Sequence, residues 1–226
     1  MSETTPSATP SGDDSPGIDP LEGDPRVAER FGDRYPAVRA FRDLLLAEGE
    51  RRGLIGPREG ARLWERHLLN SAAVVPFLPA GDVIDVGSGA GLPGLVIAAM
   101  LPEREVVLVE TMERRAQWLA EAAERLDLAR VRVIRARAET LHGTETAAAV
   151  TARAVAPLPK LARWCEPLLA PGGAMLLLKG RTAAEEVASA ASALRSLRLE
   201  AEVLEATTLD GLEPTRVVRV SRRALD

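Results

Sequence analysis

The sequence is poor in the residues from which disulfides and metal sites are built. Its 226 residues include one cysteine, Cys165, and two histidines, His67 and His142. A single cysteine forms no internal disulfide and no zinc cluster, so we expect a reducing compartment and no metal. The N-terminus lacks a basic segment followed by an apolar run, and no apolar stretch approaches the roughly 18 residues that cross a bilayer. A cytoplasmic protein, not bound to a membrane, is expected.

Aromatic residues and an excess of positive charge are also lacking. Aromatics make up 3% of the chain, and the apolar residues are mainly Ala, Val and Leu, a composition that suits helices packed on a parallel sheet. The formal net charge is −4, which argues against broad electrostatic capture of nucleic acid. Six acidic residues lie within residues 1–25, and the remainder carries 29 basic and 27 acidic residues. A local basic patch therefore remains compatible with the sequence.

The chain divides into three parts by composition and hydrophobic spacing. Residues 1–25 are acidic and rich in Ser and Pro, with almost nothing to bury, and we predict a disordered tail. Residues 26–78 contain apolar residues at helical spacing, which predicts an N-terminal helical segment. From residue 79 to residue 226, short β-rich runs alternate with helical stretches and predict an α/β domain.

Seven strands are expected in this α/β domain, at residues 83–86, 106–110, 131–135, 148–153, 174–179, 202–206 and 216–221. The first five are separated by helix-like stretches, which is typical of a Rossmann-like parallel sheet with helices on both faces. The last two lie close together in the sequence, so we predict an antiparallel pair at one edge. The fold class is thus α/β, with a mostly parallel seven-stranded sheet and an added N-terminal helical segment.

A glycine-rich turn between residues 83 and 94 is the strongest local signal. The run VIDVGSGAGLPG takes a buried strand into a turn that contains Gly87, Gly89, Gly91 and Leu92. Such a turn lets the backbone approach a ligand closely. The glycines also satisfy the dinucleotide pattern G-x-G-x-x-G, but in the wrong register to the strand. Asp85 at the strand tip would repel a pyrophosphate and attract the ammonium group of S-adenosylmethionine, so we favour the latter as cofactor.

Three further residues are expected to touch the cofactor. Glu110 closes the second strand, where folds of this class place an acid against ribose hydroxyls. Ala138 and Glu139 follow the third strand, at the edge where an adenine would lie, although a simple helix start explains them equally well from the pattern alone.

The residues at the ends of the later strands indicate the acceptor chemistry. Arg153 and Lys179 end the fourth and fifth strands and are candidate contacts to ligand or substrate. The Asn or Asp followed by two prolines and an aromatic that is common in enzymes methylating base amines is absent, and Cys165 lacks the Pro-Cys context of pyrimidine C5 enzymes. We therefore expect an acceptor such as guanine N7, which attacks with its own lone pair and needs no catalytic base.

A polar stripe on the second N-terminal helix is the candidate RNA contact. His67, Asn70 and Ser71 lie about a quarter turn from the apolar stripe of Trp64 and Leu68. Two groups of arginines could face phosphate, and the sequence leaves open which one does: Arg51, Arg52, Arg58 and Arg62, or Arg130, Arg132, Arg135 and Arg137.

Four runs in a fixed order resemble the ribosomal RNA small subunit methyltransferase G family, also called glucose-inhibited division protein B. They are residues 65–71 (ERHLLNS), 85–94 (DVGSGAGLPG), 152–154 (ARA) and 178–180 (LKG), and the likeness extends from about residue 38 to residue 220. The resemblance implies a class I methyltransferase fold, with residues 79–226 as the S-adenosylmethionine-binding domain. It also implies methylation of guanine N7 in the 530 loop of 16S rRNA.

The resemblance also implies roles for individual residues. Gly87 and Leu92 would line the S-adenosylmethionine site, Ala138 and Glu139 would flank the adenine, and Arg153 would complete the site. Asn70 stands where the family often has Asp, which removes any charged role there. The implied partner is 16S rRNA or the small ribosomal subunit, with the enzyme acting as a monomer.

Three other functions stay open at this point. A methyltransferase for a small metabolite fits the glycine turn equally well, and the polar stripe and the order of the runs argue against it. A NAD-binding dehydrogenase is disfavoured by the glycine register and by Asp85. A non-enzymatic RNA-binding protein is disfavoured because the cofactor turn is intact.

Overall fold

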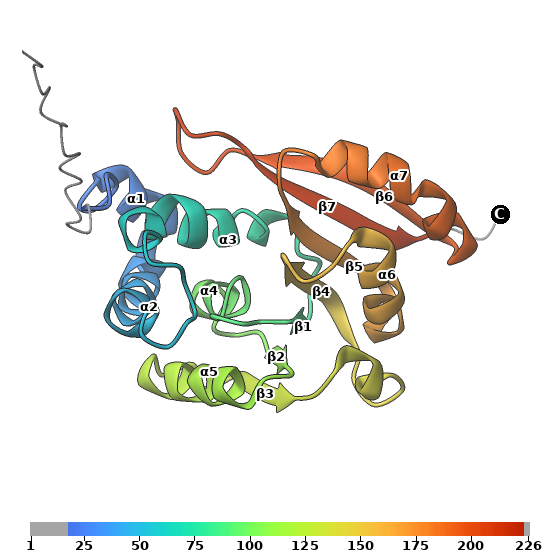
Figure 1. Cartoon of the computed structure of the whole chain (residues 1–226), viewed down its shortest axis with the longest axis horizontal. Coiled ribbons are helices and arrows are strands. Elements are labelled where there is room, and N and C mark those ends of the chain that lie inside the picture. The colour runs from blue at the N-terminus through green and yellow to red at the C-terminus, as the bar shows by residue number, and fades with distance from the viewer. Residues whose placement is uncertain (1–17, 224–226) are drawn as a thin grey trace, which may run out of the picture.

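A twisted seven-stranded sheet organises the protein, whose computed structural model describes residues 18–223 (Figure 1). The strand order is β3-β2-β1-β4-β5-β7-β6, and β7 runs antiparallel to both of its neighbours while the other pairs are parallel. The strands are β1 (Val83–Val86), β2 (Val106–Glu110), β3 (Val131–Arg135), β4 (Ala147–Arg153), β5 (Leu169–Lys179), β6 (Leu199–Ala206) and β7 (Thr215–Arg222). The prediction of a mostly parallel α/β sheet with an antiparallel edge is confirmed.

The first three strands have the predicted bounds, and the later ones are longer than predicted. The largest difference is in β5, which begins at Leu169 although the sequence predicted a start at residue 174. Pro171, Gly172 and Gly173 lie in that extension and read as a turn, because proline and glycine are unfavourable in strand interiors. Only Ala147 pairs with this part of β5, at Leu169, before a register shift, so the extension is an irregular strand start.

Helices cover both faces of the sheet, as predicted. One apolar core joins α4 (Gly94–Met100) and α5 (Glu113–Arg125) and the N-terminal helices to one face, and a second joins α6 (Leu158–Cys165), α7 (Ala183–Ser196) and the 3-10 turn Ala138–Leu141 to the other. Neighbouring strand residues alternate between the two cores. Val106 and Leu108 face the first, and Val107 and Val109 face the second. This alternation follows from the two-residue period of a strand.

The N-terminal helical segment packs on the first face beside α4 (Figure 1). It consists of α1 (Pro25–Phe31), α2 (Tyr35–Glu48) and a helical stretch over residues 60–72, with short 3-10 turns at Gly32–Arg34 and Val75–Phe77. The stretch at 60–72 changes from a 3-10 turn (Gly60–Arg62) to a π-helix (Trp64–Leu69) and then to α3 (Asn70–Ala72). A π-helix has i→i+5 hydrogen bonds, so the α-helical period does not hold along it.

The predicted disordered tail is wrong at its C-terminal end. Asp19 and Leu21 are buried, and the Asp19 carboxylate accepts hydrogen bonds from the backbone N–H groups of Leu21 (3.0 Å) and Trp64 (2.9 Å). Glu22 accepts a hydrogen bond from the Trp64 indole (3.0 Å) and pairs with Arg42 (2.6 Å). The acidic residues are ordered because they satisfy donors 20 to 45 residues away, which composition does not show. Residues 1–17 of the tail lie outside the described residues.

The chain reverses its course across the sheet between β1 and β4. It proceeds outward from β1 to β2 and β3, then returns to place β4 on the other side of β1. In open α/β sheets, the crevice at the carboxyl ends of the strands at such a switch point is where ligands bind.

Candidate active site

A cavity of about 850 Å³ lies at this switch point. It brings together seven of the nine predicted cofactor residues: Gly87, Gly89, Leu92, Glu110, Ala138, Glu139 and Arg153. They come from the loop after β1 and from the carboxyl ends of β2, β3 and β4, and the N-terminal segment adds Leu54 and His67. Its size is in the range of pockets that bury a drug-sized ligand. We call it the cofactor cavity.

The glycine loop leaves space beside its own backbone. Gly89 has φ +56°, and a Cβ at this position would approach no protein atom closer than the Gly87 carbonyl oxygen, at 3.7 Å. The N–H group of Gly89 donates to Glu110 Oε2 (3.0 Å). The other Glu110 oxygen accepts hydrogen bonds from the backbone of Thr111 (2.7 Å) and Met112 (2.9 Å). Glu110 therefore holds the loop and the end of β2 in place while it lines the cavity.

Asp85 and Gly91 do not line the cofactor cavity, contrary to the sequence prediction. The Asp85 carboxylate is buried and accepts hydrogen bonds from the Thr151 hydroxyl (2.8 Å) and the Gly94 N–H (3.1 Å). Burial raises its pKa to about 6. Asp85 thus pins the start of α4 to β4 instead of reaching for a ligand. A Cβ on Gly91 would clash with the Leu95 side chain and lie 3.2 Å from Phe41, so this glycine permits packing in the core.

A second cavity, of about 770 Å³, lies between the N-terminal helical stretch and the ends of β5 and β7. His67, Asn70, Arg153 and Lys179 line it, as predicted substrate contacts should. We call it the acceptor cavity. It meets the cofactor cavity at three residues that line both: His67, Arg153 and Ala154.

Ser71 does not reach the acceptor cavity, so its predicted contact with RNA is wrong. The residue is fully buried, and its hydroxyl has no hydrogen-bond partner within residues 18–223. The prediction assumed a regular α-helix, whereas the π-helix before Asn70 changes the angular spacing and turns Ser71 toward the core. Asn70 does face the cavity, where its amide donates to the Thr215 hydroxyl (3.2 Å).

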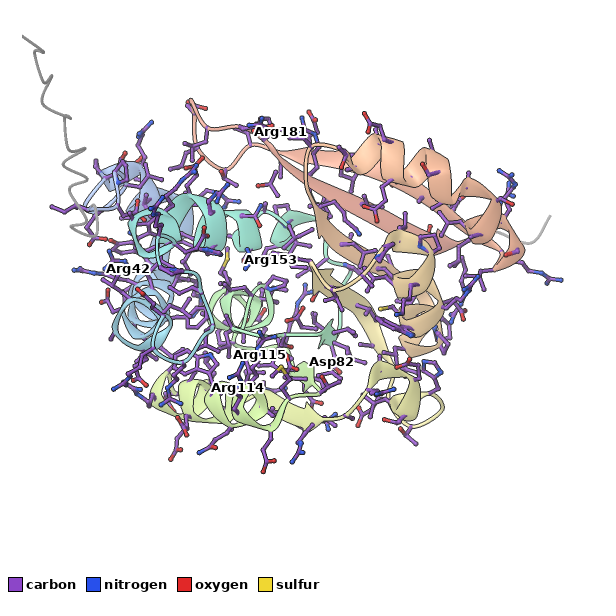
Figure 2. The ribbon with its side chains drawn as sticks, viewed as in Figure 1. Arg42, Asp82, Arg114, Arg115, Arg153 and Arg181 are labelled. Carbon is purple, nitrogen blue, oxygen red and sulfur yellow. The ribbon has the colours of Figure 1, made fainter. Side chains whose placement is uncertain are left out.

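Arg153 lies at the boundary between the two cavities, near the centre of the molecule (Figure 2). Its guanidinium donates to the Arg66 carbonyl (3.1 Å) and to His67 Nδ1 (3.2 Å). Because arginine only donates, Nδ1 must be the acceptor nitrogen of His67. The other ring nitrogen then carries the proton and donates to Glu59 Oε2 (2.5 Å). Burial, and next the charge of Arg153, lower the pKa of His67, so the imidazole is neutral.

The backbone at this boundary is unusual. Ala154 has φ +54°, a left-handed conformation that costs a residue with a Cβ about 1–2 kcal/mol. Strain of this kind is concentrated at functional sites, where the surrounding structure holds it in place. Lys179 is also held, because its ammonium group contacts Glu186 (2.8 Å) and the Ala156 carbonyl (3.3 Å).

Neither His67 nor Cys165 is available to act as a base. Cys165 is fully buried, and burial raises its pKa to about 12. Both nitrogens of His67 are engaged by neighbours. Within residues 18–223 no group of three or more His, Cys, Asp or Glu could hold a metal ion, and no helix is long and apolar enough to cross a membrane. The arrangement can bind and orient two ligands that meet at Arg153.

The sequence did not indicate Glu59, and it left open which arginines face the RNA. Glu59, which orients His67, lies in a stretch that glycines and a proline marked only as an interruption, and no periodic signal points to it. The sequence analysis identified two arginine clusters but did not decide which of them faces phosphate. Arg52 and Arg132 pair with glutamates away from both cavities. Arg62 lines the acceptor cavity, where it pairs with Glu65, and Arg137 lines the cofactor cavity.

Comparison with known proteins gives one family. A family model described as rRNA small subunit methyltransferase G matches residues 34–211, well over half of the chain. Ribosomal RNA small subunit methyltransferase G of Beutenbergia cavernae is 52% identical over 195 residues, which cover 85% of this chain and 92% of that protein.

Solved structures with low sequence identity share the fold. Ribosomal protein L11 methylase of Lactobacillus delbrueckii subsp. bulgaricus superposes with a TM-score of 0.54 at 14% identity, covering 69% of this chain and 77% of that one. A SAM-dependent O-methyltransferase of Thermotoga maritima gives a TM-score of 0.50 at 18% identity, covering 70% and 66%. The architecture is therefore the Rossmann-like methyltransferase fold that the sequence predicted.

Proposed function

The chain belongs to the rRNA small subunit methyltransferase G family, and from this premise we propose that it methylates N7 of a guanosine in the 530 loop of 16S rRNA, with S-adenosylmethionine as methyl donor. The observation that carries the proposal is the meeting of two cavities at His67, Arg153 and Ala154. One cavity has the features of a cofactor site, and the other opens beside basic residues that suit RNA.

The residues of the cofactor cavity fit S-adenosylmethionine. The free space beside Gly89 is where a ligand can lie against the loop backbone. Arg153 donates to a carbonyl and an imidazole but forms no ion pair with an Asp or Glu within residues 18–223. The carboxylate of the methionine part of the cofactor would neutralise its charge. Glu110 would face the ribose, and Ala138 and Glu139 would flank the adenine. When bound, S-adenosylmethionine supplies an electrophilic methyl group on a sulfonium.

The engagement of both His67 nitrogens and the burial of Cys165 support an acceptor that needs no base. Guanine N7 carries a free lone pair on the major-groove edge, so no proton leaves the base as the methyl group arrives. The protein then contributes by placing the acceptor in line with the methyl group and by excluding water. His67 holds Arg153 in position, and Lys179 lines the acceptor cavity, where it would contact the RNA.

Family membership argues against the small-metabolite alternative. The proposal includes a monomer without a metal ion, acting in the cytoplasm on 16S rRNA or on the small subunit. The acceptor cavity is lined by six basic and three acidic residues, so a mildly acidic chain has a local surface of net positive charge for the RNA.

The test is methylation of defined RNA. The purified chain is incubated with labelled S-adenosylmethionine and either 16S rRNA or small subunits, and 7-methylguanosine is mapped by chemical cleavage and primer extension. We expect one modified guanosine, in the 530 loop. A matched RNA with 7-deazaguanosine at that position keeps the base pairing but has no N7 lone pair, and it should accept no label. Label in the deaza RNA, or a different modified position, would refute the proposed acceptor.

A further inference from the structure

A three-residue ion-pair cluster stands at the rim of the acceptor cavity. It consists of Arg181, just after β5, Glu213 in the loop between β6 and β7, and Arg216 on β7. Figure 2 shows Arg181 near the top of the view, above Arg153. All three residues line the cavity, and Arg181 is the most exposed of them.

Glu213 holds both arginines with its two carboxylate oxygens. Arg181 donates through Nε to both oxygens (3.0 and 2.9 Å) and through a terminal nitrogen to Oε2 (2.7 Å). Arg216 donates to Oε1 at 3.1 Å. Hydrogen bonds from Arg181 and then Arg216 lower the pKa of Glu213, so it is a carboxylate at neutral pH. A side-on carboxylate with two donors from one arginine has the same geometry as a phosphate bound by that arginine.

The cluster is exposed and its members are unequally held. The side chain of Arg181 is 82% exposed and that of Glu213 is 43% exposed. Exposed ion pairs contribute little to stability, so Glu213 can leave Arg181 at small cost. Arg216 is only 24% exposed and has a second partner, Glu205, at 3.3 Å. If Glu213 withdraws, Arg216 stays in place and Arg181 becomes available.

The other acidic residues of the cavity are placed differently. Glu65 pairs with Arg62 within the same helical stretch, and Glu59 is tied to His67. The Glu65–Arg62 pair is also exposed, but Glu65 holds a single arginine. Glu59 is 27% exposed and orients His67, so its release would disturb the boundary between the two cavities. Glu213 comes from the loop between the edge strand β6 and β7, and among the acidic residues that line the cavity it is the one that pairs with two arginines.

We propose that Glu213 occupies, in the free protein, the position that a phosphate of the substrate RNA takes in the complex. The inference rests on the proposed function, because it identifies RNA as the occupant of the acceptor cavity. RNA phosphate displaces the carboxylate and binds Arg181 and Arg216 in its place. The exchange makes the entrance selective, since a ligand without a phosphate in this position has to compete with Glu213 and gains nothing from the arginines.

The exchange predicts an increase in affinity when the competing carboxylate is removed. Glu213→Gln keeps the size of the side chain but leaves Arg181 without a neutralising charge. The dissociation constant for a small-subunit RNA fragment containing the 530 loop should fall up to about five-fold, the range expected for one exposed ion pair. The dependence of log affinity on log salt should steepen by about one, because the phosphate contact of the variant is a net new ion pair, whereas the wild type gives up the Glu213 pair to form it.

The experiment compares this variant with a matched control and a double variant, with S-adenosylhomocysteine present throughout. Glu202→Gln removes the same charge from an exposed glutamate that pairs with Arg219 (3.8 Å) on the same two strands but does not line the cavity. It should leave affinity and salt dependence near those of the wild type. Adding Arg181→Ala to Glu213→Gln should reverse both changes.

Two outcomes separate the inference from the function on which it rests. If the wild type binds and methylates the RNA but Glu213→Gln binds no more tightly than Glu202→Gln, the phosphate exchange is refuted and the proposed function stands. If the wild type neither methylates this RNA nor prefers it to an unrelated RNA of the same length, the proposed function and the inference are both refuted.

Discussion

Replacement of His67 by glutamine or by asparagine separates the two hydrogen bonds of its ring. His67 accepts from Arg153 through Nδ1 and donates to Glu59 through Nε2. An asparagine amide lies near the position of Nδ1, and a glutamine amide reaches the position of Nε2. His67→Asn can therefore keep the acceptor for Arg153 and lose Glu59, while His67→Gln keeps Glu59 and loses the acceptor. Only the second change should release the guanidinium from its position between the cavities.

The magnitude follows from the chemistry of the lost bond. A hydrogen bond to a charged group contributes about 1.5–3 kcal/mol, or roughly ten- to hundred-fold in an equilibrium constant. Arg153 keeps its bond to the Arg66 carbonyl and borders an open cavity, where water replaces part of the loss, so the lower limit applies. We expect His67→Gln to bind S-adenosylhomocysteine about ten-fold more weakly than the wild type, and His67→Asn to bind it within about three-fold.

Calorimetric titration with S-adenosylhomocysteine measures this directly, and single-turnover methylation from pH 6.5 to 9 tests the chemistry. Burial and Arg153 lower the pKa of His67, so the ring stays neutral across that range and the rate should be nearly flat for all three proteins. Equal binding by the two variants would refute the positioning role. A ten-fold rise in the wild-type rate through one ionisation, absent from both variants, would make His67 a base.

Three further predictions concern the loop, the N-terminal contact and the buried carboxyl. Gly89→Val should weaken S-adenosylhomocysteine binding more than ten-fold, because the valine side chain enters the cofactor cavity. Gly143→Val, which is also at positive φ with open space around it, should lower stability without changing this affinity. Equal calorimetric affinities of the two variants would contradict the prediction. Asp19→Ala should lower the free energy of unfolding by about 2–4 kcal/mol, because two backbone N–H groups lose their acceptor, and exposed Asp33→Ala should change it little in urea titrations followed by tryptophan fluorescence. The pKa of Asp85 rises from 3.8 to about 6 on folding. Its contribution to the free energy of unfolding is therefore greatest below pH 3.8, and it falls by about 3 kcal/mol as the pH rises through 6. Asp85→Asn should lack this decrease when urea unfolding is compared between pH 4 and 7, and an unchanged pH dependence would refute it.

Local patterns were sufficient for the framework of this protein. Strand bounds at β1, β2 and β3 were predicted correctly because buried parallel strands are short apolar runs between turns. The glycine loop and Glu110 were placed at one cavity because the carboxyl ends of parallel strands meet at one edge of a sheet. These features depend on residues close together in the chain.

Contacts between distant residues were decided only by the tertiary structure. Asp85 belongs to the predicted loop, but its hydrogen-bond partner Thr151 comes from β4, 66 positions later, and this partner gives it a structural role. The acidic stretch before α1 is ordered because it meets Trp64. No spacing rule on a single helix predicts such pairs.

The sequence by itself determined the fold class, the cofactor loop and the family, since these follow from periodicity and from runs of residues that act locally. The tertiary structure decided that Arg153 meets a histidine 86 positions earlier and that Glu213 closes on Arg181, 32 positions earlier. The physical reason is that a hydrogen bond or ion pair acts over about 3 Å, so its partners are set by how the helices and strands pack and not by their order in the chain.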